Sequence, residues 1–257
     1  MKISYKIALL IIIVSIIPVF LISHSAFKHS QIIIEDMAEK HLKSLSDNKY
    51  NAFMLWLEES RQILENFSQS ETVVRILNSE KKTEEKSRAL NQFFFNGIVS
   101  KRFTNLSVVK ADTKKIKKCF NSDLDNLSKS FCLYYNKDAK KPVMTTLKSV
   151  SSVKEDLVLV AEIDLIYFSE KIIQTSVKDF YEDIYIISKD NFFVTYPEAG
   201  RKNKIFEKAG KQIQSLAGPD QIIFTGEFKN LNGENVAGVV RWLPEIGSYL
   251  VVETDKD

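Results

Sequence analysis

The stretch IALLIIIVSIIPVFLI, residues Ile7 to Ile22, decides how the rest of the chain is organised. It holds no charged residue, and only Ser15 and Pro18 interrupt a block dominated by isoleucine, leucine and valine. Extended through SHSAF to Phe27, a helix rising about 1.5 Å per residue reaches about 30 Å, the thickness of a hydrocarbon core. We therefore expect residues 1–27 to anchor the chain in a membrane.

Two other interpretations of this run stay open. Lys2 and Lys6 would suit the start of a signal peptide, with Ser23 and Ser25 as a cleavage site. A core helix of a soluble protein is the other alternative, but the run shows no polar face. Lys2, Lys6 and the amino terminus slightly outweigh Lys28 in positive charge, which favours a body outside the cytoplasm, anchored in the inner membrane.

Length and composition describe an ordinary globular chain beyond the anchor. About 230 of the 257 residues remain, enough for one large domain or two small ones. The net charge of +3 is spread along the sequence, so it does not favour nucleic-acid binding. The only two cysteines, Cys119 and Cys132, either form a disulfide outside the cytoplasm or remain as two buried thiols.

Residues 28–67 contain no proline or glycine and predict one long amphipathic stalk helix. One apolar stripe runs through Ile34, Leu42, Leu45, Ala52, Trp56, Ile63 and Phe67, and a second through Ile33, Met37, Phe53, Leu57 and Leu64. One stripe can face the chain's own domains while the other packs against a second copy of the helix, forming a homodimer. Alternatively, both stripes are buried within one chain.

The remaining sequence predicts two sets of antiparallel strands, each preceded by helix. Short helices are expected in SQSETVVRILN and TEEKSRALNQFFF, with Ser68 or Ser70 as N-cap of the first. Another begins after Asp164 in LIYFSEKIIQTSV, and one spans about 206–217. The expected strands are NLSVVKA, KKIKKCF, SFCLYYN, PVMTTLKSV and DLVLVAEI, then YEDIYIIS, FFVTYP, IIFTGEF, VAGVVRWL and SYLVVET.

With these elements in order, the chain resembles the double Cache sensor region found outside the cytoplasm in bacterial transmembrane receptors. Three stretches carry the resemblance: HLKSLSDNKYNAFMLWLEESRQILENFSQS, IYIISKDNFFVTYP and VAGVVRWLPEIGSYLVVETD, which look like the family's stalk signature, paired strands and closing hairpin. Each motif is loose, and their order over nearly the whole chain is the specific signal. Such regions serve chemoreceptors, sensor histidine kinases and diguanylate cyclases.

The resemblance implies an α+β fold with two PAS-like lobes along one helix. We expect an anchor at 1–27, the stalk at 28–67, a membrane-distal lobe at 68–164, a connecting helix at 165–178 and a proximal lobe at 179–257. The sequence ends at Asp257 without a second membrane helix or an output domain. We interpret it as an excised input region, with a truncated receptor as the alternative. Any kinase or cyclase would lie beyond Asp257.

The residue inventory argues against an enzyme. All three histidines, at 24, 29 and 41, lie in the anchor or early stalk, so neither lobe has one for a metal or nucleophile site. The eight glycines form no phosphate-binding loop. We therefore expect no catalytic residue, metal or cofactor.

Three residues are candidates for ligand contact. Aligning VAEIDLIYF with the family's corresponding strand places Glu162 at the acid that pairs with the ammonium group of amino-acid ligands. The plain alternative, which we favour from the sequence, is an exposed edge carboxylate. Tyr134 and Tyr135 stand where the family's Arg, Trp and Tyr signature is missing, and strand alternation points one inward and one outward. The ligand class therefore stays open among amino acids, amines and carboxylates.

Two other groups have plain structural interpretations. Lysines in KKIKK, residues 114–118, can attract an anion but more commonly protect an edge strand. The phenylalanines at 93, 94, 95, 103 and 120 predict the distal core, Trp56 predicts stalk packing, and Trp242 and Tyr249 predict proximal packing. We favour a small-molecule sensing region of a transmembrane receptor. The alternative is an anchored binding or scaffold protein without signalling output.

Overall fold

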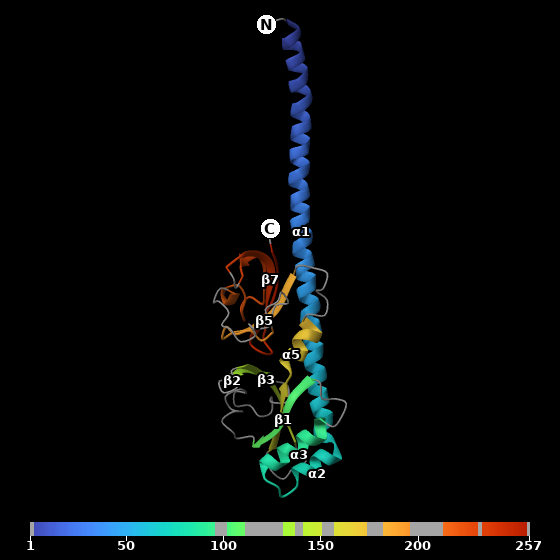
Figure 1. The fold of residues 1–257 in the computed structure, drawn as a ribbon, viewed down its shortest axis with the longest axis vertical. Helices are drawn as coiled ribbons and strands as arrows, with labels where there is room; N and C mark the ends of the chain where they lie inside the picture. Colours follow the sequence, from blue (N-terminus) through green and yellow to red (C-terminus); the bar gives the residue numbers. More distant parts are fainter. Residues whose placement is uncertain are drawn as a thin grey trace.

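The computed structural model describes residues 3–95, 102–110, 131–136, 141–150, 157–173, 182–195, 213–230 and 233–255, with side chains from Ile16 onward except those of Lys141 and Gln214. One long helix runs the length of the molecule, and two small sheets lie one after the other along its second half (Figure 1). We call the part built on β1 to β4, with its helices, the first lobe, and the part built on β5 to β8 the second lobe. The predicted α+β class is confirmed.

The stalk is helix α1, Ile3–Gln69, which is longer than the predicted stalk because it continues back through the expected anchor. Pro18 lies within it. The side chains of residues 7–15 of the apolar run lie outside the described part, whereas those from Ile16 to Phe27 are exposed. Within the described residues, no helix combines the length and apolar character needed to cross a membrane.

Both apolar stripes of the stalk are buried within the chain where α1 meets the lobes. Leu42 and Trp56 come from one stripe and Phe53, Leu57 and Leu64 from the other, and each is at most 3% exposed. The alternative of burial within one chain therefore holds from Leu42 onward. Before that point the apolar side chains are exposed: Ile32, Ile33, Ile34 and Met37.

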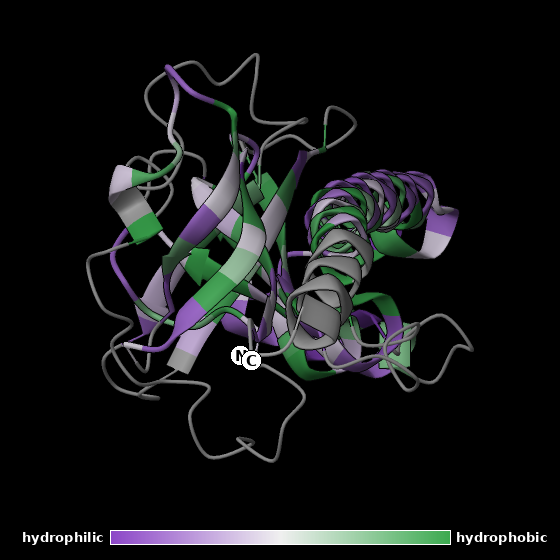
Figure 2. Ribbon diagram, turned by 90° about the horizontal axis from the view of Figure 1, so that it is seen from above, coloured by the Kyte–Doolittle hydropathy of each residue, from purple (hydrophilic) through white to green (hydrophobic). Residues whose placement is uncertain are grey.

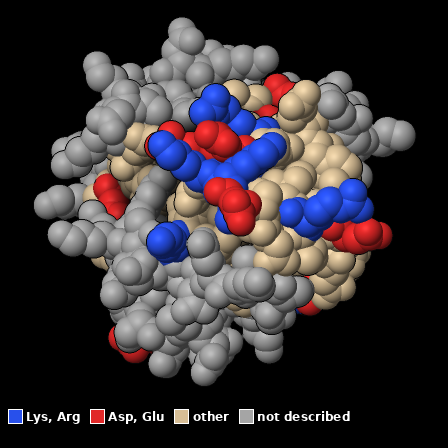
Figure 3. Space-filling model, turned by 90° about the horizontal axis from the view of Figure 1, so that it is seen from below, with Lys and Arg blue, Asp and Glu red and all other residues tan. Residues whose placement is uncertain are grey.

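Two short helices fold back from the far end of the stalk. Helix α2, Glu71–Leu77, is N-capped by Ser70, whose side chain accepts a hydrogen bond from the Val73 amide. Helix α3, Thr83–Phe95, then lies against the first sheet. Figure 3 looks at this end of the molecule and shows basic and acidic side chains interspersed, with no gathering of one sign among the described residues.

The first sheet contains β1 (Phe103–Lys110), β2 (Phe131–Asn136), β3 (Lys141–Ser149) and β4 (Leu157–Ile163). They pair antiparallel in the order β1-β4-β3-β2. Helix α3 also serves the backbone of β1: Asn91 exchanges hydrogen bonds with the Leu106 amide and carbonyl, and the Ser87 hydroxyl accepts from the Val108 amide at 2.9 Å. These side chains satisfy polar groups along a sheet edge.

A short helical segment leads from the first sheet to the second lobe. Asp164 N-caps α5, Leu165–Phe168, because its carboxylate accepts hydrogen bonds from the amides of Ile166 and Tyr167. The helix then widens into a π-helical turn, Ser169–Ile173. The predicted connecting helix is thus helical to Ile173, and the rest of its range, 174–178, lies outside the described residues.

The second sheet repeats the arrangement of the first. Its strands are β5 (Glu182–Ser188), β6 (Ile223–Lys229), β7 (Asn235–Leu243) and β8 (Ser248–Asp255), antiparallel in the order β5-β8-β7-β6. One face packs on the stalk and joins the same hydrophobic core as the first sheet. The other face has its own core, which includes Tyr185, Phe193 and Tyr249, with Trp242 packed against it.

Three predictions within the described residues were wrong. The segment FFVTYP forms no regular strand in residues 192–195 but a single bridge from Phe193 to Ile187. Asn191 turns the chain with φ 62°, and the amides of Val194 and Thr195 both approach the Ile186 carbonyl, so no ladder extends. The helix expected over 206–217 is a 3₁₀ turn, Ile213–Ser215, in its described part. Phe93 and Phe95 are 43% and 36% exposed rather than core.

The stalk contacts both lobes through polar as well as apolar side chains. Arg241 of β7 pairs with Asp47 of α1 and lies over the Tyr50 ring at 4.7 Å. Lys148 of β3 pairs with Glu65 at 2.8 Å. Seen along the stalk, α1 runs beside the sheets rather than across them (Figure 2).

Candidate ligand-binding site

A row of polar side chains crosses the first sheet on the face turned away from the stalk. The strand register sets Glu162 of β4 opposite Asn105 of β1 on one side and Thr145 of β3 on the other, and Thr145 opposite Cys132 of β2. Directly paired residues point to the same face, and neighbouring strands lie about 4.8 Å apart. The row therefore places a carboxylate between an amide and a hydroxyl.

This face differs in character from the one that packs on α1. The alternate residues of β4, Leu157, Leu159, Ala161 and Ile163, are buried in the main core. On the outward face, Val158 and Leu147 form a small separate cluster beside the polar row. Glu162 is half-buried and Thr145 is 3% exposed. Among the described residues, the row is therefore partly shielded from solvent but still accessible at Glu162. The Glu162 carboxylate in such surroundings can bind a ligand that carries a positive charge.

Next to the row, a bulge interrupts the pairing of β1 with β4. The register shifts between Phe103 and Asn105, leaving Thr104 as the extra residue. The bulge turns Phe103 into the core while Asn105 remains on the polar face. Bulges of this kind re-aim side chains and are common beside functional sites.

Tyr134 and Tyr135 are separated by strand alternation, as their positions predict. Tyr134 shares the face of Cys132 and Glu162, whereas Tyr135 points to the opposite side and packs on Phe192 of the second lobe at a ring distance of 5.5 Å. Cys132 is disulfide-bonded. Cys119, the other cysteine of the sequence, lies outside the described residues, so the pairing of the two stays a prediction.

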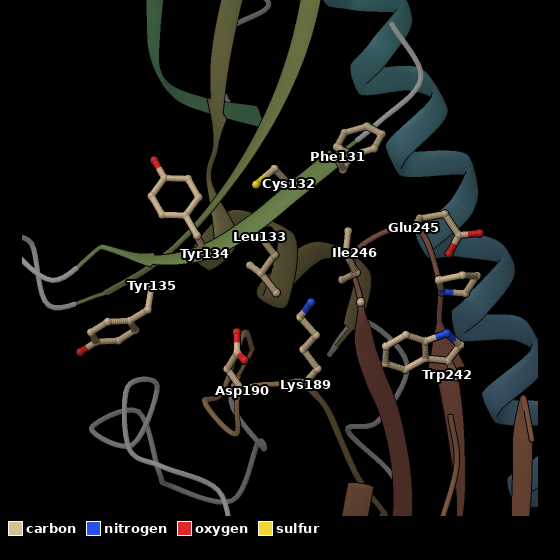
Figure 4. Close-up of a pocket in the computed structure, with 12 residues that line it drawn as sticks. Phe131, Cys132, Leu133, Tyr134, Tyr135, Lys189, Asp190, Trp242, Glu245 and Ile246 are labelled. Atoms are coloured by element: carbon tan, nitrogen blue, oxygen red, sulfur yellow. The ribbon is translucent and has the colours of Figure 1, made fainter. Parts of the chain in front are cut away.

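A hollow lies between the two lobes and adjoins the polar row at Cys132, which lines it. Its volume is about 750 Å³, and β2 forms one wall while the turns after β5 and β7 form the other. Tyr134 and Tyr135 both line this cleft. In Figure 4 Lys189 and Asp190 point toward β2 from the second lobe, whereas the Tyr134 ring points away from that lobe. Glu162 does not line the cleft. Two of the three predicted contact residues, Tyr134 and Tyr135, therefore line the cleft, whereas Glu162 lies in the polar row.

Trp56 lies behind the first sheet rather than at its polar face. It is 2% exposed, and its ring is 4.7 Å from that of Phe168 and 5.8 Å from the Arg102 guanidinium. Arg102 also pairs with Glu59 on the stalk and donates to the Trp56 carbonyl at 3.3 Å. The stalk, the start of β1 and the connecting segment after β4 meet at this indole.

Sequence reasoning missed Asn105 and Thr145. Both lie in strands that the sequence predicts, but an asparagine or threonine within a strand carries no signal of its own. Only the register, together with the bulge in β1, shows that they flank Glu162. The predicted lysine run, 114–118, and Phe120 lie outside the described residues.

No protein-family model matches the sequence, and no curated protein matches it. Solved structures do match. The Vibrio cholerae histidine kinase DctB sensor domain aligns with a TM-score of 0.56 and 11% identity, over 86% of this chain and 98% of that one. The ligand-binding domain of the Pseudomonas aeruginosa amino acid chemoreceptor PctB, in complex with L-Arg, gives 0.53 and 13%, over 86% and 88%.

The chain has the double Cache fold. The ligand-binding domain of the Pseudomonas fluorescens chemoreceptor CtaA, in complex with L-isoleucine, is a further match with a TM-score of 0.50 and 13% identity, over 89% of this chain and 96% of that one. At such identities the likeness shows the fold alone. The double Cache resemblance in the sequence is thus confirmed for architecture, and the ligand must be argued from this chain's own residues.

Proposed function

We propose that this chain is the small-molecule sensing region of a bacterial transmembrane receptor, with its ligand on the outward face of the first sheet. The observation that carries the proposal is the row in which Asn105, Glu162 and Thr145 lie side by side. Solved double Cache domains of chemoreceptors hold amino acids. That likeness supports a sensory role, and the row supplies the chemistry here.

The row favours a ligand with an ammonium group. A half-buried carboxylate at Glu162 would bind a positive charge with charge-assisted hydrogen bonds. The Asn105 amide can donate to a neighbouring carboxylate or hydroxyl of the same ligand. The Thr145 hydroxyl, which donates to the Cys132 carbonyl at 3.5 Å, can accept from a ligand hydroxyl or ammonium group. Amino acids and small amines fit this arrangement better than a simple carboxylate, which Glu162 would repel.

The route from the site to the stalk follows the chain. Glu162 is two residues before Asp164, which caps α5. In the π-helical turn that follows, the Ile172 carbonyl accepts a hydrogen bond from Lys49 of the stalk at 3.1 Å. A ligand that shifts the end of β4 would thus bias the stalk by its differential affinity for two arrangements. We further propose an inner-membrane anchor, a body that is periplasmic or extracellular, and a homodimer through the exposed early stalk.

A thermal-shift screen of the full chain in detergent against amino acids, amines and carboxylates tests this function. At about 100 times its dissociation constant a ligand adds about 2.7 kcal/mol of stability, which is a visible shift. Glu162→Gln should abolish the shift from an ammonium ligand, whereas Glu84→Gln, an exposed acid on α3, should preserve it. A shift that survives Glu162→Gln would contradict the site, and no shift with any compound would contradict direct sensing of these classes.

A further inference from the structure

One carboxyl group in the second lobe occupies a position that the strand pattern gives to apolar residues. On β8, Tyr249 and Val251 point to the face turned away from the stalk, and both are buried in the core of that face. Glu253 comes next in the same alternation and is 6% exposed. A buried acid in such a row costs stability unless its surroundings favour it, and such departures mark functional sites.

The groups around Glu253 come from each neighbouring element. From β5, the Tyr185 hydroxyl donates to Oε2 at 2.7 Å, and Asp183 lies directly across the strand pair. From the turn after β6, the Asn230 amide hydrogen-bonds the carboxyl, and it also donates to Glu234 at 3.0 Å. On β8 itself Asp255 stands two residues further on, and β7 contributes Gly238, which brings no side chain.

Two opposing influences act on this carboxyl. The pKa of Glu253 is raised from 4.5 to about 7, and burial is the largest cause of the rise. The hydrogen bonds from Tyr185 and Asn230 oppose it, whereas the nearby charges of Asp183 and Asp255 act in the same direction as burial. The group therefore changes its charge near neutral pH, where an ordinary glutamate is fully ionised.

We propose that the second lobe binds a proton at Glu253, and that this proton determines how firmly β8 pairs with β5. When Glu253 is neutral, its buried carboxyl is not repelled by the charge of Asp183. When it is ionised, it faces Asp183 across the strand pair, and like charges directly opposite one another weaken a sheet. The proton would be a second input, separate from the ligand of the first lobe and independent of whether that ligand exists.

The position of Glu253 connects it to the stalk. Thr254, its neighbour, pairs with Glu182, and the Glu182 carboxylate contacts His41 of α1 at 3.0 Å. Figure 1 shows the end of β8 beside α1, on the side toward the N-terminus. A change in the pairing of Glu253 with Asp183 would thus occur one residue along the strands from the pair Thr254 and Glu182. The Glu182 member of that pair contacts the stalk.

The direction of the pH effect follows from the raised pKa. The folded chain holds the Glu253 proton more tightly than the unfolded chain, so this contribution to stability is complete below about pH 4.5 and is lost as the pH rises through about 7. In urea unfolding of the full chain in detergent, the unfolding equilibrium constant should rise about 100-fold between pH 5 and pH 8. Glu253→Gln should remove most of that rise.

Two further variants keep the test decisive even if Glu253→Gln folds poorly. Tyr185→Phe removes a hydrogen bond that favours the ionised form, so the midpoint of the pH dependence should move to higher pH. Asp183→Asn removes a repelling charge, so the midpoint should move to lower pH. As a control, His41→Gln removes the contact between the stalk and Glu182 and should leave both shifts in place.

The outcomes separate cleanly. Opposite midpoint shifts in Tyr185→Phe and Asp183→Asn would support the proton site, as would a flat profile in Glu253→Gln. An unchanged profile in all three variants, or a profile abolished only by His41→Gln, would overturn it. Because no ligand is added, none of these results depends on the site in the first lobe.

Discussion

At Trp56 the stalk, the start of β1 and the connecting segment after β4 meet. Trp56 is 2% exposed, whereas its neighbour Leu55 on the same helix is 61% exposed. Trp56→Ala should lower the free energy of unfolding by about 3 to 5 kcal/mol, since it removes a large buried ring from between the stalk and Phe168.

Urea unfolding of the two variants side by side checks this. Leu55→Ala, which loses an exposed side chain, should change stability by no more than about 0.5 kcal/mol. Equal effects of the two substitutions would show that the indole does not lie in the core.

At the same scale, sequence reasoning could identify side chains but not their neighbours. Alternation correctly separates Tyr134 from Tyr135, because successive residues of a strand must point to opposite faces. It cannot show that Glu162 stands between Asn105 and Thr145, since a shift of one residue in pairing would turn either away. The candidate site was therefore only partly predictable: the acid from its strand, its partners only from the register.

Among the elements, the contact between α1 and β7 makes an asymmetric prediction. The Arg241 side chain is 9% exposed and that of Asp47 is 47% exposed, so the two partners differ in how much water they retain. Asp47→Asn leaves a buried guanidinium without its acid and should cost about 2 to 4 kcal/mol. Arg241→Met leaves Asp47 half in water and should cost less.

Urea unfolding of both variants and of the double variant measures this asymmetry. The double variant should be more stable than Asp47→Asn alone, since it contains no buried charge at this contact. If Asp47→Asn proves harmless while Arg241→Met is costly, the arginine acts by its packing on Tyr50 and the ion pair contributes little.

Elements were predictable where their signals are local. Ser70 and Asp164 cap the helices after them as expected, because a cap depends only on neighbouring backbone amides. The failure at FFVTYP has a tertiary cause: Asn191 turns the chain with φ 62°, and the amides of Val194 and Thr195 both hydrogen-bond the Ile186 carbonyl of β5, so the ladder does not extend. The π-helical turn at Ser169–Ile173 has no local signal that we recognise.

In the whole molecule, one hydrophobic core runs from α3 through the stalk to the second sheet, so the two lobes share a core and do not pack independently. The exposed apolar side chains of the early stalk, such as Ile33 and Met37, lie outside it. If these side chains form the proposed homodimer, Met37→Glu should shift the full chain toward monomer, measured by light scattering in detergent.

The control for that measurement is Gln92→Glu, which adds the same charge at an exposed position on α3. It should leave the mass unchanged. A chain that remains dimeric with Met37→Glu and with Ile33→Glu would place the dimer contact elsewhere, and a monomeric wild-type chain would contradict the homodimer itself.

The overall architecture was predictable because it depends on the order of many weak signals, each consistent with the others. The identity of the ligand was not predictable, because three or four side chains decide it. Their arrangement depends on pairing between strands that are far apart in the sequence. Sequence alone could therefore least predict that a small molecule binds on the outward face of the first sheet.

Hydrogen exchange of the full chain with and without the compound that gives the largest thermal shift tests that claim most directly. We predict slower exchange in β1, β3 and β4 around Asn105, Thr145 and Glu162, and in the segment after Asp164, with little change in β6 and β7. Protection confined to the cleft between the lobes, at β2 and the turns after β5 and β7, or confined to the second sheet, would contradict it.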